Sequence, residues 1–236
     1  MLYLIGLGLN EESYSRETYN VLSKADKIYI ENYTADYPYD IKQLEKQFRS
    51  KKFIVIGREF VEQDMHKLIE EAKNKDIALL IYGSPLTATT HISLIQEAKK
   101  QNIKVRVIYN ASVLDAVAET GLQLYKFGKV ASIPNFEAES FIETIKDNLS
   151  IGAHTLVLVD IGMEAQEAFE KLEKAARNHK VKLNKIVVCS RLGTKDSQIY
   201  YKNLKELQNK NIKKPFCIIL PGKMHFMEKE ILEDYG

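Results

Sequence analysis

Residues 77–91 of the chain read IALLIYGSPLTATTH, and this stretch is the clearest local mark of the fold. The apolar run at 77–82 suits a buried β-strand, and Gly83-Ser84-Pro85 after it is a turn signal. A helix-period segment follows at 90–101, so the stretch predicts one βα unit of an open sheet. Because such sheets bind ligands at the carboxyl ends of their strands, residues 83–91 are predicted to lie at a functional edge.

The same alternation extends over the first half of the chain. It predicts a mostly parallel sheet with helices on both faces. The expected strands are 2–6, 27–31, 53–56, 77–82 and 103–109. The expected helices are 15–25, 40–49, 60–75 and 90–101.

The pattern changes after Gly128, which indicates a second α/β domain. The expected strands there are 129–133, 154–160, 185–190 and 216–220. The expected helices are 137–149, 164–179 and 201–209. We therefore expect two α/β domains, residues 1–115 and 116–236, with the active site in the cleft between them.

Composition narrows the class of function. The 236 residues include 34 Lys and Arg against 32 Asp and Glu, and a net charge of +2 gives no indication of nucleic-acid binding. No apolar stretch approaches the ~20 residues of a membrane span, and the chain opens with a strand-like run rather than a targeting segment. We expect a cytoplasmic protein that binds neither membrane nor nucleic acid.

The two cysteines, Cys189 and Cys217, each lie in an apolar run. Cysteine in such a run is typical of a buried free thiol, so we expect two free thiols in neighbouring strands. No Cys and His spacing suits zinc, and we predict no metal site.

The first strand ends in Gly6-Leu7-Gly8-Leu9, and Glu31 ends the second. Together they partly match the dinucleotide-binding fingerprint, but Glu11 holds the place of its third glycine. The first helix is also expected to begin too late for phosphate binding at its N-terminus. The favoured interpretation is a tight turn in another kind of site.

Small and hydroxylated residues follow the fourth and fifth strands. Residues 87–91, TATTH, hold more of them than a turn and a helix cap require, so we predict a functional role. His91 is a candidate base or orienting group, with a structural hydrogen-bonding role as the alternative. Residues 110–113, NASV, either let a ligand lie against the backbone or form a helix start capped by Ser112.

Three features of the second half are candidates for substrate contact. Residues 120–128, TGLQLYKFG, place aromatic and basic residues between two glycines. Arg191 follows a predicted strand and either binds a carboxylate bidentately or is a surface arginine. His225 follows the last strand and is a candidate for lining the predicted cleft.

Taken in order, these segments resemble the diphthine synthase family, methyltransferases of the tetrapyrrole methylase fold (class III S-adenosylmethionine methyltransferases). The resemblance is carried by LYLIGLGL at 2–9, REFVEQ at 58–63, ATTH at 88–91, NAS at 110–112, TGLQLYKFG at 120–128, HTLVLVDI at 154–161 and PGKMH at 221–225. It implies a homodimeric enzyme that uses S-adenosylmethionine. Its implied substrate is elongation factor 2 whose target histidine carries a 3-amino-3-carboxypropyl group, which is methylated repeatedly on the amino group.

The resemblance also implies site residues. The implied cofactor contacts are Leu9, Ser84, Thr87, Ser112, Val113, Val159, Leu192 and Phe216. Arg191 and His225 would contact the substrate, and His91 would accept a proton or orient a group. Ser84 departs from the family pattern, which has Asp at this position.

Two alternatives stay open on the sequence alone. One is an enzyme of the same fold that methylates a small molecule such as a tetrapyrrole intermediate. The other, suggested by Ser84, is a cofactor-binding protein that has lost catalysis.

Overall fold

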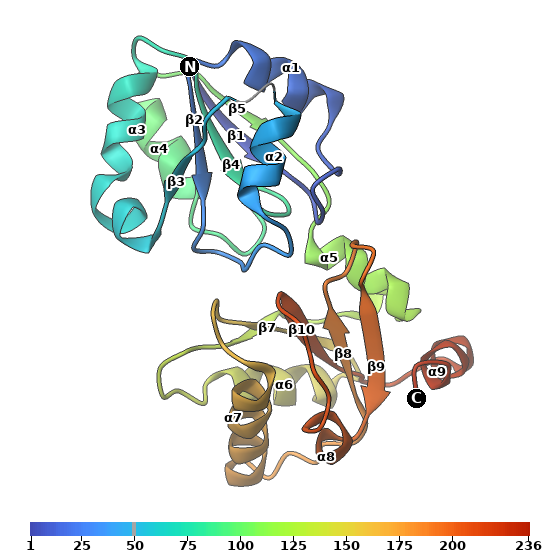
Figure 1. Ribbon diagram of the computed structural model, residues 1–236. Helices are drawn as coiled ribbons and strands as arrows, with labels where there is room; N and C mark the ends of the chain where they lie inside the picture. The colour runs from blue at the N-terminus through green and yellow to red at the C-terminus, as the bar shows by residue number, and fades with distance from the viewer. Residues whose placement is uncertain (49–50) are drawn as a thin grey trace. The chain divides into compact units, whose positions relative to one another are not determined.

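The structure is a computed structural model that describes residues 1–48 and 51–236, apart from the side chains of Val61 and Glu62 (Figure 1). The chain divides into two compact units, Met1–Leu114 (unit 1) and Asp115–Gly236 (unit 2). Each unit contains a five-stranded sheet and helices, so the α/β prediction is confirmed. Within the described residues, no helix is both long and apolar enough to cross a membrane.

Unit 1 is built on a parallel sheet with the strand order β3-β2-β4-β1-β5. The strands are β1 Leu2–Gly6, β2 Lys27–Glu31, β3 Ile54–Ile56, β4 Ile77–Ile81 and β5 Val105–Ile108. All five residues of β4 are buried. Strands covered on both faces read as continuous apolar runs, which is why the sequence predicted them correctly.

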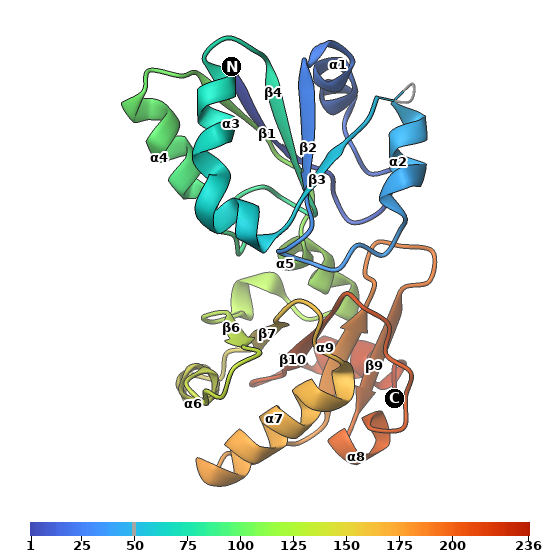
Figure 2. The ribbon, with the colours of Figure 1, turned by 60° about the vertical axis from the view of Figure 1, so that its left-hand side comes forward.

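Helices cover both faces of this sheet (Figure 2). They are α1 Arg16–Lys24, α2 Ile41–Gln47, α3 Met65–Ala72 and α4 Ile92–Lys100, with a π-helical turn at Phe60–Asp64. Residues of α3 and α4, such as Leu68 and Leu94, share one core cluster, and Leu22 of α1 and Leu44 of α2 share the other. The four predicted helices are confirmed, although Arg49, in the predicted span 40–49, lies outside the described residues.

The neighbouring strands β1 and β4 lead to helices on opposite faces of the sheet. The helix after β1 is α1, and the helix after β4 is α4. In open α/β sheets this reversal leaves a crevice at the carboxyl ends of the two strands, where ligands bind. The fold therefore places residues 7–9 and 82–91 at the expected edge of unit 1.

Unit 2 has a mixed sheet with the strand order β6-β7-β10-β8-β9. Its strands are β6 Ala131–Ile133, β7 Thr155–Val159, β8 Ile186–Ser190, β9 Gln198–Lys202 and β10 Phe216–Leu220. Only the β6–β7 pair is parallel. Cys189 and Cys217 lie opposite each other in β8 and β10, and both are buried and free, as predicted.

The helices of unit 2 are α6 Phe141–Ser150, α7 Ala165–Asn178, α8 Leu204–Leu207 and α9 Phe226–Glu233. The short α5 Val113–Ala116 begins in unit 1, and 3₁₀ turns follow at Val117–Thr120 and Leu124–Lys126. The buried side of α7 includes Phe169 and Leu172, which join the core cluster of this sheet. Their spacing is that of an amphipathic helix, which made α7 predictable.

The predicted helix at 201–209 is wrong in most of its length. Residues 198–202 form β9, which pairs with β8 in an antiparallel ladder, and only Leu204–Leu207 is helical. Asn203 and Glu206 form a capping box that begins the helix after the strand. Ile199, Tyr200 and Tyr201 belong to residue types that are enriched in strands, so β propensity was a local signal that the helix prediction overlooked.

Candidate functional site

Two loops are joined at the carboxyl edge of unit 1. The Leu7 amide donates to the Ile81 carbonyl over 2.9 Å, beyond the end of β1. The Gly8 amide donates to the Gly83 carbonyl over 3.1 Å, and the Gly83 amide donates back over 2.9 Å. The loops after β1 and β4 are therefore held against each other by their backbones.

This close approach explains the Gly-x-Gly pattern of the first strand. A Cβ atom on Gly6 would lie 2.6 Å from the Gly83 carbonyl oxygen, and one on Gly8 would lie 2.5 Å from Ser13 Cβ. Gly8 and Gly83 also have φ values of +75° and +72°, which favour glycine. The glycines serve backbone packing at a strand end, in agreement with the favoured interpretation.

The loop after β5 joins the same edge through Asn110. Its Nδ2 donates to the Gly6 carbonyl over 3.2 Å and to the Ser13 carbonyl over 2.9 Å. The Ser112 hydroxyl accepts from the Leu114 amide over 3.2 Å, at the start of α5. The interpretation of 110–113 as a capped helix start is confirmed.

Five of the implied cofactor residues lie in these three loops of unit 1. Leu9 follows the Gly8 bridge and is buried, and its carbonyl accepts from the Tyr82 hydroxyl over 3.1 Å. Ser84 is buried and its carbonyl accepts from the Thr87 amide over 3.2 Å. The fold thus brings together Leu9, Ser84, Thr87, Ser112 and Val113 at one edge of unit 1.

His91 is completely buried at the start of α4. Its Nδ1 lies 3.2 Å from the Pro85 carbonyl, which can only accept, so Nδ1 carries the hydrogen and Nε2 carries a lone pair. Among the described residues, Nε2 has no hydrogen-bond partner. Burial lowers the pKa of His91 to about 4, so the ring is neutral at neutral pH.

Glu31 is a second buried polar group at this edge, at the carboxyl end of β2. Its Oε2 accepts from the Thr34 amide over 3.2 Å, and Oε1 accepts from the Thr34 hydroxyl. Burial raises the pKa of Glu31 to about 7. The sequence showed Glu31 only as part of an incomplete fingerprint, and a glutamate directly after the run Ile28-Tyr29-Ile30 was the signal available.

The other three implied cofactor residues lie in unit 2. Val159 ends β7, Phe216 begins β10, and Leu192 follows the end of β8 and is buried. Since β10 runs antiparallel to both β7 and β8, all three lie at one edge of this sheet.

Arg191 and His225 already have partners within unit 2. Arg191 Nε donates to the Lys214 carbonyl over 2.8 Å, and Nη1 donates to Asp196 Oδ2 over 2.7 Å. His225 caps α9, and its exposed ring lies 4.3 Å from that of Phe226. Their contact with a substrate stays a prediction.

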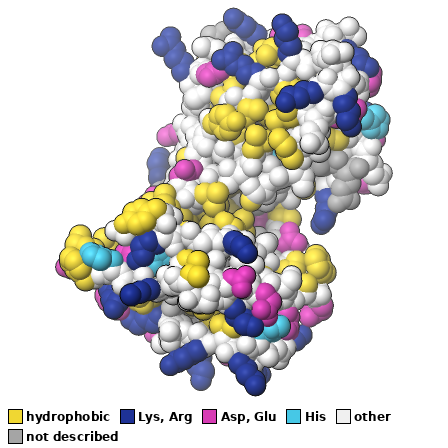
Figure 3. Space-filling model, turned by 180° about the vertical axis from the view of Figure 1, so that it is seen from behind, with side chains coloured by type: hydrophobic (Ala, Val, Ile, Leu, Met, Phe, Trp, Pro, Cys, Tyr) yellow, Lys and Arg dark blue, Asp and Glu magenta, His cyan; other side chains and the backbone are white. Residues whose placement is uncertain are grey.

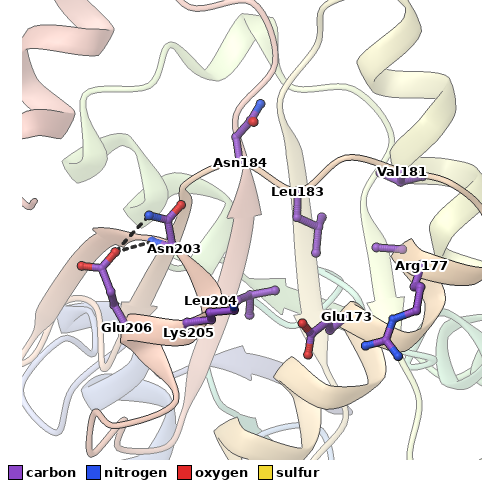
Figure 4. A pocket seen from close by; sticks show the side chains of 10 residues that line it. Glu173, Arg177, Val181, Leu183, Asn184, Asn203, Leu204, Lys205 and Glu206 are labelled. Carbon is purple, nitrogen blue, oxygen red and sulfur yellow. Dashed lines mark hydrogen bonds between the residues drawn. The ribbon is translucent and has the colours of Figure 1, made fainter.

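A hollow of about 600 Å³ lies between α7 and α8 in unit 2 (Figure 4). Arg177, Leu183, Asn203 and Leu204 are among the residues that line it. Within the described part of the chain, its lining includes none of the predicted site residues. This hollow is therefore separate from the candidate site in sequence and in fold.

Charged side chains of both signs lie on the surface of both units. On the face seen in Figure 3, Lys and Arg side chains are spread over both units, and acidic side chains lie among them. Residues 1–48 and 51–236 contain no group of three or more His, Cys, Asp or Glu side chains that could hold a metal ion.

Comparison with known proteins identifies the family. The family model described as Tetrapyrrole (Corrin/Porphyrin) Methylases matches residues 1–208. Diphthine synthases from Methanococcus maripaludis and Methanocaldococcus jannaschii are each 42% identical, covering 99% of this chain and 98% of their own length. A crystal structure of diphthine synthase superposes with a TM-score of 0.92 at 32% identity, covering 100% of this chain and 96% of the other.

These findings confirm the resemblance and the methylase fold predicted from sequence. The chain belongs to the tetrapyrrole methylase family and, within it, to the diphthine synthases, which are methyltransferases.

Proposed function

We propose that the chain is an S-adenosylmethionine-dependent enzyme of diphthamide biosynthesis. Its substrate is elongation factor 2 whose target histidine carries a 3-amino-3-carboxypropyl group, and it methylates the amino group repeatedly. The observation that carries this proposal is the full-length similarity to diphthine synthases. The enzyme acts as a homodimer in the cytoplasm, where its protein substrate is found.

Leu9, Ser84, Thr87, Ser112 and Val113 of unit 1, with Val159, Leu192 and Phe216 of unit 2, would hold the cofactor. The residues present fit such a ligand, because the joined loops of unit 1 include the small residues Gly83, Ser84 and Ser112, which let a bound molecule approach the backbone N–H and C=O groups. When bound, S-adenosylmethionine supplies a methyl group on a sulfonium, which is already a good leaving group. The chain's own residues need only align the reactants and exclude water.

The attacking amine must lose a proton before each transfer, and His91 is suited to orient it. Its bare Nε2 is a hydrogen-bond acceptor held in one tautomer by the Pro85 carbonyl. Because its pKa is about 4, His91 accepts a hydrogen bond without retaining the proton, which passes to water. No residue acts as a covalent nucleophile in this scheme.

Arg191 and His225 would contact the substrate in unit 2. Arg191 already pairs with Asp196 and donates from Nε to the Lys214 carbonyl, which leaves other guanidinium donors for a substrate. An arginine in such a pair is held in a fixed orientation, which favours recognition of a second carboxylate by its remaining donors.

Intact-mass analysis of elongation factor 2 tests the function directly. The factor bearing the aminocarboxypropyl-histidine is incubated with this protein and S-adenosylmethionine, beside a control factor with unmodified histidine. Stepwise methyl additions only on the modified factor are expected. Cofactor binding without any addition would favour a small-molecule substrate, and absence of both would favour a protein that has lost catalysis.

A further inference from the structure

Glu31 is an ionisable carboxyl group that the fold buries without a counter-charge. The side chain is completely buried, and among the described residues no Lys, Arg or His forms an ion pair with it. The Thr34 amide and hydroxyl donate to it, and a backbone hydrogen bond from Tyr33 also favours its charged form. A buried carboxylate without a cation destabilises a protein, so a group of this kind needs an explanation beyond folding.

Hydrogen bonds from Thr34 and the Tyr33 backbone do not by themselves require a carboxylate. A glutamine at position 31 could accept from the Thr34 amide through Oε1 and donate from Nε2 to the Thr34 hydroxyl oxygen, because a hydroxyl both donates and accepts. The neutral amide would therefore keep the turn and avoid the cost of burying a charge. What glutamate adds to this arrangement is negative charge.

Tyr33 and Tyr37, which follow Glu31 in the chain, each pack against residues of the candidate site. Tyr33 packs edge-on against the His91 ring at 6.1 Å, and its hydroxyl lies 3.2 Å from Thr90 Oγ1. On the other side, Tyr37 packs against Tyr82 at 5.5 Å, and Tyr82 donates to the Leu9 carbonyl. The Tyr33 backbone hydrogen-bonds to Glu31, and burial and then the charge of Glu31 raise the pKa of Tyr37. Both tyrosines therefore connect the carboxyl group to the edge that holds His91 and Leu9.

We propose that Glu31 supplies the negative charge that stabilises the onium cation handled in unit 1. This cation is either the sulfonium of S-adenosylmethionine or the ammonium of the methylated substrate, and the inference rests on the proposed function. Direct contact is not required, because a buried charge acts over several ångströms where water is excluded.

Calorimetric titration with S-adenosylmethionine and with S-adenosylhomocysteine tests this role, because the two ligands differ by a methyl group and the sulfonium charge. The variants are Glu31→Gln, which removes the charge, and Thr34→Val, which removes the hydroxyl donor but keeps the charge. Glu71→Gln is the matched control, since Glu71 accepts from Lys27 and Tyr29 near the other end of β2. Each variant is also assayed for methyl transfer to the modified elongation factor.

If Glu31 faces the sulfonium, Glu31→Gln weakens S-adenosylmethionine about tenfold and leaves S-adenosylhomocysteine within about twofold. If Glu31 instead faces the substrate ammonium, Glu31→Gln leaves the affinities for both cofactor ligands unchanged and raises KM for the elongation factor about tenfold. Thr34→Val and Glu71→Gln are expected to leave the ratio of the two affinities unchanged.

Equal weakening of both ligands, no change in any of these values, or an unfolded Glu31→Gln protein would show a structural role and overturn the inference. Failure of the proposed function has a different signature, because the wild-type chain would then transfer no methyl group to the modified elongation factor. A wild-type chain that still binds both ligands would test the inference through the ratio of the two affinities, whereas a chain that binds neither ligand would have no onium site. That result would overturn both proposals.

Discussion

His154 donates a hydrogen bond from Nε2 to Glu228 Oε1 over 3.1 Å, and both side chains are completely buried in unit 2. The direction of this bond follows from the other ring nitrogen, since His154 Nδ1 accepts from the Gly222 amide over 2.9 Å and must be bare. The histidine is therefore neutral, and burial lowers its pKa.

The same glutamate organises two segments that the sequence analysis singled out. Gln123 and Lys126, from the TGLQLYKFG segment, donate to the two carboxylate oxygens, and the His225 amide donates to Oε2 over 2.6 Å. Burial alone would raise the pKa of Glu228, but these donors together with His154 hold it at about 2. Much of TGLQLYKFG and PGKMH thus has a structural explanation in this network.

Removing the charge of Glu228 is expected to destabilise unit 2. Glu228→Gln removes the negative partner of Lys126, and its side-chain NH₂ group would face groups that themselves donate hydrogen bonds. Together these effects are expected to lower the free energy of unfolding by about 3 kcal/mol. Urea denaturation measures the change. Glu230→Gln, at an exposed position of the same helix, is the control and should shift the value by less than about 0.5 kcal/mol. Equal midpoints for the two variants would show that the network contributes nothing.

Glu31 is expected to make the protein less stable as the pH rises. Because its folded-state pKa is about 7 and lies above its ordinary value of 4.5, the folded state holds a proton that the unfolded state has lost. Wild-type stability should therefore fall between about pH 4.5 and pH 7. Glu31→Gln removes this loss and should be more stable at pH 8 by up to about 3 kcal/mol, with no difference near pH 4. Thermal melts at both pH values provide the measurement, and a variant less stable at pH 8 would contradict it.

Substitution of His91 should slow methyl transfer without abolishing it. His91→Asn removes the bare Nε2 acceptor, and since water can take the proton, we expect a loss of about tenfold in kcat. Quenched assays on the modified elongation factor measure the rate, with His66→Asn at an exposed position of α3 as the control. A complete loss of turnover in a folded variant that still binds cofactor would show that His91 has an indispensable role in the chemistry.

Ser84 offers a test of the departure from the family pattern. An aspartate there could replace a neutral hydrogen bond to the cofactor by a charge-assisted one, so Ser84→Asp should tighten S-adenosylmethionine by ~1–2 kcal/mol. Calorimetry measures the affinity after a thermal melt has established that the variant is folded. Ser93→Asp, at an exposed position of α4, controls for added negative charge in unit 1. Weaker binding by folded Ser84→Asp would place this side chain outside the cofactor contacts.

The sequence by itself determined the parallel sheet of unit 1 and its helices, because buried strands such as β4 are continuous apolar runs. It also placed the small-residue loops at the ends of β1, β4 and β5. These features are encoded over a few neighbouring residues, and the ordered segments that carry the family resemblance are of the same local kind.

Only the tertiary structure determined which polar side chains are buried and which hydrogen-bond partners they have. His154 and Glu228 are 74 residues apart, and β9 is defined by its ladder to β8. The burial of Glu31 and the tautomer of His91 depend on packing around them and, for His91, on the carbonyl of Pro85. Residue type states which charge or hydrogen bond a side chain can offer, but burial and the distance to a partner set its pKa and its role, and both arise only when distant segments pack together.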